Sequence, residues 1–272
     1  MILNAIKSKL DALNANGQQQ EKTDYSTIFW KPQIGKQTIR IVPSAYDPAF
    51  PFKELKFHYG VGKYPMVALS NFGKQDPIEE FVKELRKTND KDNWSLSGKL
   101  NPKTRIFAPV VVRGEEDKGV RLWGFGITIY KALLALAEDE DIGDYTDVIN
   151  GWDMVVEMRE GNPYPETSVR IKPKQTPLSD NNDQVDLWLK EQPNPVEVHR
   201  EYDYDFIKKQ LQNYLNPGSG DEADDTPSTS NETSGHTMSD VIKAPIKSDF
   251  SLENATTDSQ DTVSKFDDLF NE

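Results

Sequence analysis

The sequence predicts a mostly β protein of the α+β class, built as a small, mostly antiparallel barrel or curled sheet with helices added to it. Five or six short segments rich in β-branched or alternating apolar residues are separated by turn residues. Only a few helical stretches lie between them, which favours antiparallel pairing over a parallel sheet with crossover helices. The last fifty-six residues are too polar to form a core, so the folded part is about 200 residues long.

Strand and helix signals alternate along this folded part. The first strand signal is the β-branched run 38–42, which ends at Pro43, and the turn 113–119 separates two later runs. Strands are predicted over residues 38–42, 55–59, 105–112, 120–125, 152–157 and 168–172. Helices are predicted over residues 78–87, 128–137, 185–190 and 204–215, where apolar residues recur at helical spacing or a Pro precedes the segment.

The C-terminal segment, residues 217–272, is predicted to be a disordered acidic tail. It contains thirteen Asp and Glu against three Lys and is rich in Ser and Thr. Its scattered apolar residues cannot offset the entropy of ordering it. One apolar cluster stands at its end, where a partner groove could bury the aromatic and aliphatic side chains. This predicted partner-binding cluster is Phe266, Asp267, Asp268, Leu269 and Phe270.

Charge is unevenly distributed along the chain. The formal net charge is −13, of which the tail contributes −10. Residues 22–131 carry nineteen Lys and Arg against twelve Asp and Glu, a net charge of +7, whereas residues 132–216 carry a net charge of −10. A basic surface joined to an acidic tail indicates a module that binds polyanions and whose tail competes with the ligand.

The N-terminal residues 1–20 are predicted to form a short amphipathic arm. Leu3, Ile6, Leu10 and Leu13 recur at helical spacing, and a polar stretch over residues 14–21 tethers the arm to the body. Such an arm either packs on its own domain or docks on a neighbouring copy. The residues predicted for self-association are Ile6, Lys7, Ser8, Lys9 and Leu10.

Cations and aromatic residues alternate on the predicted strands. Residues two apart share a face of a strand, so Arg121, Trp123 and Phe125 project together, as do Arg105 and Phe107. A ring beside a cation on an open sheet face suits a single-stranded nucleic acid, because bases stack on the ring while the cation neutralises phosphate. The alternative is that these rings belong to the core and the cations only border the sheet.

Several motifs occur in an order that resembles a known family. They are the string 37–44, then His58, Lys103-Thr104 before a Phe107-Ala108 strand, 119–127 with its helix, and the acidic end Asp267-Asp268-Leu269. Together they resemble the T-even-phage-type single-stranded DNA-binding, helix-destabilising protein. The resemblance implies an OB-fold-like core over residues 21–216, with a small subdomain at about 60–103. It also implies sequence-nonspecific, cooperative binding through the arm and a tail that recruits replication, recombination and repair proteins.

Positions that match the family supply the predicted DNA contacts. Arg40 and Lys56 would contact phosphate, Trp94 and Trp123 would take the places of stacking tyrosines, and Tyr164 would lie near a further aromatic contact. Phe107 stands where the family has a Trp. The full predicted DNA-binding set is Arg40, Lys56, Lys63, Tyr64, Trp94, Lys103, Arg105, Phe107, Arg121, Trp123, Tyr164, Arg170 and Lys172.

No cofactor is expected, although the best-known family member holds a structural zinc through one His and three Cys. His58 is present, but Asp76 and Glu79 stand where a Cys pair would be, and the chain has no Cys. The carboxylate runs 115–117 and 138–141 are interpreted as solvated loops and not as a metal-dependent nuclease site. No phosphate loop, nucleophile elbow or zinc-protease motif occurs, so the protein is predicted not to be an enzyme.

The sequence therefore predicts a protein that coats single-stranded DNA during phage replication, recombination and repair. Its predicted partners are single-stranded DNA, other copies of itself, and replication proteins that meet the tail. No stretch approaches a membrane span, and the predicted location is the cytoplasm of the infected bacterial host. The alternative is a non-enzymatic acidic adaptor that mimics nucleic acid and binds basic proteins. Affinity for single-stranded DNA distinguishes the two.

Overall fold

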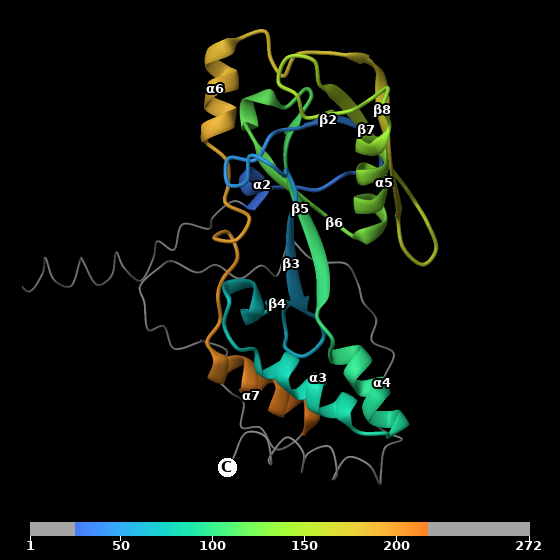
Figure 1. Cartoon of the computed structure of the whole chain (residues 1–272), viewed down its shortest axis with the longest axis vertical. Helices are drawn as coiled ribbons and strands as arrows, with labels where there is room; N and C mark the ends of the chain where they lie inside the picture. The colour runs from blue at the N-terminus through green and yellow to red at the C-terminus, as the bar shows by residue number, and fades with distance from the viewer. Residues whose placement is uncertain (1–24, 217–272) are drawn as a thin grey trace, which may run out of the picture.

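The computed structural model describes residues 25–216 as a sheet-containing body joined to a helical subdomain (Figure 1). The strands are β1 (Phe29–Trp30), β2 (Gly35–Ile41), β3 (Lys53–His58), β4 (Met66–Val67), β5 (Lys103–Val112), β6 (Arg121–Phe125), β7 (Trp152–Arg159) and β8 (Glu166–Gln175). The helices are α2 (Tyr25–Ile28), α3 (Pro77–Lys87), α4 (Lys91–Leu100), α5 (Ile127–Glu138), α6 (Asn182–Lys190) and α7 (Tyr204–Leu215). No helix within residues 25–216 is long and apolar enough to cross a membrane.

The mixed α+β class is confirmed, but the expected barrel is not formed. The sheet runs in the order β1-β6-β5-β2-β7-β8, with β3 paired to β5 and to β4. All of these pairings are antiparallel except β1 with β6. The end strands β1 and β8 do not pair with each other, and β1 has only two residues with which to hydrogen-bond. The sheet therefore stays open.

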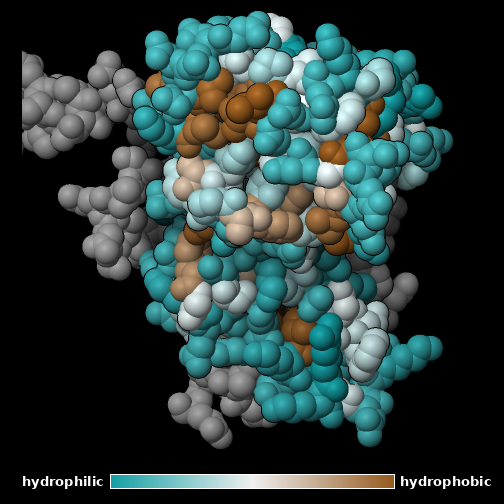
Figure 2. Space-filling view, turned by 45° about the horizontal axis from the view of Figure 1, so that its top comes forward, coloured by the Kyte–Doolittle hydropathy of each residue, from teal (hydrophilic) through white to brown (hydrophobic). Residues whose placement is uncertain are grey.

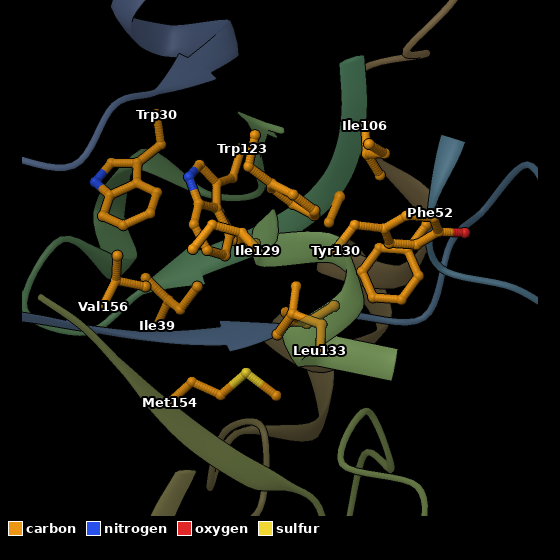
Figure 3. Packing of buried hydrophobic residues seen from close by; sticks show 14 of the residues in the cluster. Trp30, Ile39, Phe52, Ile106, Trp123, Ile129, Tyr130, Leu133, Met154 and Val156 are labelled. Atoms are coloured by element: carbon orange, nitrogen blue, oxygen red, sulfur yellow. The ribbon is translucent and has the colours of Figure 1, made fainter. Parts of the chain in front are cut away.

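The main core lies on one face of this sheet. On β5, Ile106, Ala108 and Val110 point into it, and on β6 Trp123 and Phe125 do so. Figure 3 shows Trp123 beside Trp30 within this packed cluster. Helix α5 covers the cluster with Ile129, Tyr130 and Leu133, and it contacts both β5 and β8. The opposite face of β5 is also buried, because Phe107 and Val111 belong to two further apolar clusters.

The helical subdomain has a core of its own. Ile78, Phe81, Val82 and Leu85 line one side of α3 at the spacing of a buried helical face. Asp76 caps the start of α3 by accepting hydrogen bonds from the backbone N–H groups of the first turn. Helix α7, far along the chain, packs into the same cluster, so this core combines residues 61–100 with residues 202–215.

One extended segment joins the two parts. Residues 191–203 run from α6 in the sheet body to α7 in the subdomain, drawn in orange in Figure 1. The Gln192 side chain donates to the Pro43 and Trp188 carbonyls and accepts from the Ala45 amide. His199 packs among the rings of Phe29, Phe57 and Phe107, with ring centroids 5.0 to 5.7 Å apart. The segment is therefore held along much of its length.

The six predicted strands and four predicted helices are all present, within a few residues of their expected ends. The structure adds α4, α2 and the two-residue strands β1 and β4, none of which was predicted. Helix α4 was missed because few of its residues are apolar and buried: Leu96 and Leu100 pack against the subdomain core, the other two buried positions are Asn93 and Ser97, and the remaining residues are exposed or partly exposed. Its apolar stripe is too weak to stand out in the sequence.

Candidate nucleic-acid interface

Four of the predicted DNA contacts are buried, and the first of them is Arg40. Its guanidinium donates to Asp153 Oδ1 (3.1 Å), to the Asp147 carbonyl (3.2 Å) and to the carbonyl and hydroxyl of Thr176 (2.6 Å each). Arg113 binds the same carboxylate, so Asp153 is held between two cations. Arg40 is fully buried and its donors are used within the fold. The predicted phosphate contact by Arg40 is therefore wrong.

The aromatic face predicted on β6 is the core face. Trp123 is 1% exposed, and Arg121 is buried with its guanidinium donating to Glu115 Oε2 (2.7 Å). The inference that Arg121, Trp123 and Phe125 share a face holds, because all three lie opposite the inward residues of β5. However, α5 packs over Trp123 and Phe125 on that face, and Arg121 is buried against Glu115, so the three side chains are not accessible to DNA in this fold.

Phe107 is buried on the other face of the sheet. Its ring lies against the backbone of Gly124 so closely that a Cβ added at Gly124 would stand 2.9 Å from the ring. The ring also contacts Phe29, Phe57 and His199. Gly124 and Phe107 thus form a close packing pair, and the predicted base contact by Phe107 is also wrong.

Exposed cations remain along the ladder of β3 and β5, which leads from the sheet body toward the subdomain. Lys56 lies opposite Thr104 and forms an ion pair with Glu79 (3.6 Å). Lys103 is exposed, and the partly exposed Arg105 donates to the Gly124 carbonyl (3.0 Å). The pairing register puts Lys56 on the opposite face of the ladder from Lys103 and Arg105. These cations therefore border the ladder on both sides.

Trp94 is the most exposed aromatic side chain in the described residues, with 64% of its surface accessible. It lies in the first turn of α4, the helix that leads directly into β5. A shallow hollow of about 550 Å³ beside it is lined by Arg86 and Lys91, together with polar residues of the α3–α4 connection. A ring with two neighbouring cations is the arrangement that binds a stacked base and its phosphate. The sequence reasoning found Trp94 but missed Arg86 and Lys91, because no motif joins residues of α3 to those of α4.

Two further aromatic residues of the predicted set are accessible in connecting loops. Tyr64, between β3 and β4, lies under the Lys63 ammonium at 5.4 Å from the ring centroid. Tyr164 stands in the turn between β7 and β8 with 48% of its surface exposed. Arg170 and Lys172 follow on β8, where Arg170 is exposed. In Figure 1 this turn lies on the same side of the view as α4.

A second hollow lies beside the segment that joins the two parts. It has a volume of about 330 Å³ and lies between the β2–β3 connection and residues 192–197. Tyr46 and Phe50 on its wall are partly exposed, and Phe107 and Leu122 contribute to its lining. The sequence reasoning did not identify this hollow, because the residues on its two walls are about 150 positions apart in the chain.

The position of the family's zinc site does not fit a zinc ion in this chain. His58 Nε2 is 2.9 Å from Asp76 Oδ2, and both side chains are fully buried. The Asp76 carboxylate also accepts from the amides of Leu69, Ile78 and Glu79, so its oxygens are already used. No group of three or more His, Cys, Asp or Glu suited to a metal occurs within residues 25–216. Zinc prefers thiolate and imidazole donors, and this site offers one imidazole and one fully hydrogen-bonded carboxylate.

At the position of the family's zinc site, this chain has a hydrogen bond between His58 and Asp76. It joins β3 to the start of α3, and so ties the sheet body to the subdomain. Burial raises the pKa of Asp76, but the hydrogen bond and charge of His58, with the backbone amides, outweigh it and hold the pKa below its usual range. Asp76 is therefore ionised and serves at once as helix cap and His58 partner.

The self-association residues Ile6 to Leu10 and the tail residues Phe266 to Phe270 lie outside the described residues. A family model described as gp32 DNA binding protein like matches residues 33–200, which is more than half of the chain. The match includes β2 to β8 and α3 to α6, and it leaves out α2 and β1 before it and α7 after it. A search of curated proteins found no match to this chain.

Proposed function

Because the chain belongs to the gp32-like family of DNA-binding proteins, which bind single strands and are not enzymes, we propose that it coats single-stranded DNA cooperatively and without sequence preference. In this proposal it protects DNA during phage replication, recombination and repair in the cytoplasm of the infected host. The observation that supports it most directly is the exposed Trp94 ring beside Arg86 and Lys91. Stacking of bases on such a ring does not depend strongly on base identity.

The proposed DNA contacts are the predicted residues whose side chains are at least partly exposed, together with the two cations beside Trp94. This set keeps Lys56, Lys63, Tyr64, Trp94, Lys103, Arg105, Tyr164, Arg170 and Lys172, and it adds Arg86 and Lys91. The cations would neutralise phosphates while the three rings stack on bases. The basic half of the sequence, residues 22–131, supplies most of these cations.

A salt titration of oligonucleotide binding tests this function. The logarithm of the binding constant should fall linearly with the logarithm of salt concentration, with a slope of about −0.7 for each neutralised phosphate. The variants Arg86→Gln and Lys91→Gln should each make the slope shallower by up to about 0.7. Lys118→Gln is the matched control, because Lys118 is exposed but pairs with Glu115 away from the proposed contacts. Binding that ignores salt, or a protein that binds basic proteins and not DNA, would favour the nucleic-acid mimic instead.

The acidic tail has a separate proposed role in recruiting replication proteins. Phe266, Leu269 and Phe270 are uncharged residues at the end of a segment with a net charge of −10, so a partner groove can bury them while the acidic residues assist docking. Replacing all three with Ser should abolish partner capture and leave DNA affinity unchanged, measured by pull-down and by oligonucleotide titration of the same variant. Capture that survives the triple substitution would place the contact elsewhere in the tail.

A further inference from the structure

Helix α5 carries an exposed stripe that its packing on the sheet does not explain. Ile127 and Leu134 are 54% and 37% exposed, and they lie seven positions apart, which puts them on one face of the helix. Lys131 and Glu138 are exposed on the same face and complete the spacing i, i+4, i+7, i+11. The buried residues Ile129, Tyr130 and Leu133 lie on the other side, against the sheet.

This pairing of aliphatic side chains on α5 differs from the rest of the described surface. The other large aliphatic residues that are exposed within residues 25–216, Ile34, Ile149 and Leu187, lie far apart in the chain and on different segments, and the exposed rings of Tyr46 and Phe50 line the second hollow. On the face drawn in Figure 2, apolar surface forms several patches that are separated by hydrophilic residues. A stripe with alternating spacings of four and three is the seam that one helix presents to another.

The end of α5 has an unfavourable charge distribution. Glu138 ends the helix and Asp139, Glu140 and Asp141 follow it, all of them exposed. None of these four carboxylates pairs with a cation within residues 25–216. The C-terminal end of a helix carries partial negative charge, so carboxylates there repel it and a bound cation would relieve the repulsion.

The N-terminal arm has the complementary pattern. Leu3, Ile6, Leu10 and Leu13 are spaced by three, four and three residues, which forms the same kind of seam. Lys7 and Lys9 lie among them and could approach the carboxylates at the end of α5. We propose that the exposed stripe of α5 is the docking surface for residues 1–13 of a neighbouring copy of this chain. The inference rests on the proposed function, because cooperative coating of DNA requires a contact between neighbours.

The connection between the arm and the described fold sets how far the arm can reach. Residues 14–24 separate the predicted arm helix from α2, and eleven extended residues span up to about 40 Å. That reach would also allow the arm to dock on its own α5, so the experiment must distinguish the two arrangements.

The first measurement uses a fluorescent peptide of residues 1–20 and the chain lacking those residues, which keeps every residue of the described fold. Fluorescence anisotropy should show binding that weakens at least tenfold with the double substitution Ile127→Asp and Leu134→Asp. Ile149→Asp is the matched control, because it removes an aliphatic side chain that is 72% exposed but lies off α5. Circular dichroism should show the same melting for all three proteins, since the replaced residues are exposed. Equal binding of the peptide to the α5 variant, or no binding to either protein, would overturn the proposal.

The second measurement separates neighbours from self-docking. The chain lacking the arm and the α5 double variant should each bind short oligonucleotides normally and coat long ones without cooperativity. On an oligonucleotide that holds two molecules, a mixture should recover cooperative pairing, because one partner supplies the arm and the other supplies α5. No recovery in the mixture would show docking within one chain, and association of the armless chain through α5 would show an α5–α5 contact. Either result would refute the proposal. If instead the unmodified chain does not bind short oligonucleotides, the proposed function is refuted, and the peptide-binding measurement still tests the contact between the arm and α5.

Discussion

Two tryptophans with opposite environments give the sharpest test of the interface. Trp94 is 64% exposed on α4, while Trp123 is 1% exposed in the main core. Replacing Trp94 with Ala should remove base stacking, which contributes about 1–3 kcal/mol per base and corresponds to about 5- to 150-fold in affinity. It should leave stability nearly unchanged, because substitutions of exposed residues alter it by about 0.5 kcal/mol or less.

Replacing Trp123 with Ala should do the reverse. It deletes a fully buried ring that packs against Trp30 and Phe125, with ring centroids 5.6 and 4.5 Å away. Removal of a core Trp costs about 3–5 kcal/mol, a large share of the 5–15 kcal/mol that stabilises a typical domain. Any loss of DNA binding should then track the unfolded fraction.

The assay combines oligonucleotide titration with urea unfolding for both variants. Fluorescence quenching by DNA should be lost in Trp94→Ala, since Trp94 is the tryptophan that a stacked base can reach. Trp94→Phe is the matched control, because it keeps an aromatic face and should retain most of the affinity. If Trp94→Ala binds as tightly as the unmodified chain, or if Trp123→Ala weakens binding while remaining fully folded, the assignment of these two rings is refuted.

Three further predictions concern charged groups. Asp76→Asn should destabilise the subdomain by about 1.5–3 kcal/mol in urea unfolding, since it replaces a buried carboxylate that is hydrogen-bonded to His58 and to backbone amides. A chelator should leave the melting temperature of the unmodified chain unchanged, and a chelator-induced drop would restore a metal to this site. Burial lowers the pKa of His199 from 6.5 to about 4. As the pH falls, the imidazole is therefore protonated in the unfolded chain before it is protonated in the folded chain. The free energy of unfolding should fall by about 3 kcal/mol between about pH 6.5 and about pH 4. His199→Phe should remove that part of the pH dependence, and identical acid profiles of the two proteins would contradict it. Deleting residues 217–272 should tighten single-stranded DNA binding and ease duplex melting at low salt, with the gain fading once the screening length is about 8 Å or less; weaker binding after deletion would exclude tail competition.

In the candidate site, residue patterns predicted which side chains share a strand face but not whether that face is accessible. Period-two alternation correctly puts Arg121, Trp123 and Phe125 on one face of β6. The alternation does not predict whether that face is exposed to solvent, because α5 covers it. The position of α5 depends on its own apolar stripe and on its contacts with β5 and β8. The phosphate contact predicted for Arg40 came from its match to the family and not from the pattern of the strand, and in this fold Asp153 and two backbone carbonyls enclose its guanidinium.

The subdomain gives a second example. Its helix α3 follows from the spacing of Ile78, Phe81, Val82 and Leu85, and the absence of Cys already argued against a zinc site. The replacement, a buried His58–Asp76 pair, could not be inferred, because it depends on β3 meeting the start of α3. The contribution of α7 to the same core also depends on the path of the chain in space, since residues 191–203 lead from α6 in the sheet body to α7 in the subdomain.

The amino-acid sequence by itself determined the six longer strands, four of the helices, the separation of basic and acidic halves, and the accessible rings in polar surroundings such as Trp94, Tyr64 and Tyr164. These features depend on local propensity, periodicity and composition, which act over a few residues. Only the tertiary structure decided that the sheet stays open, which face of each strand is covered, and which cations are enclosed by partners. Burial is a property of segments distant in the chain that meet in space, and the alternation along one strand carries no information about what packs against it.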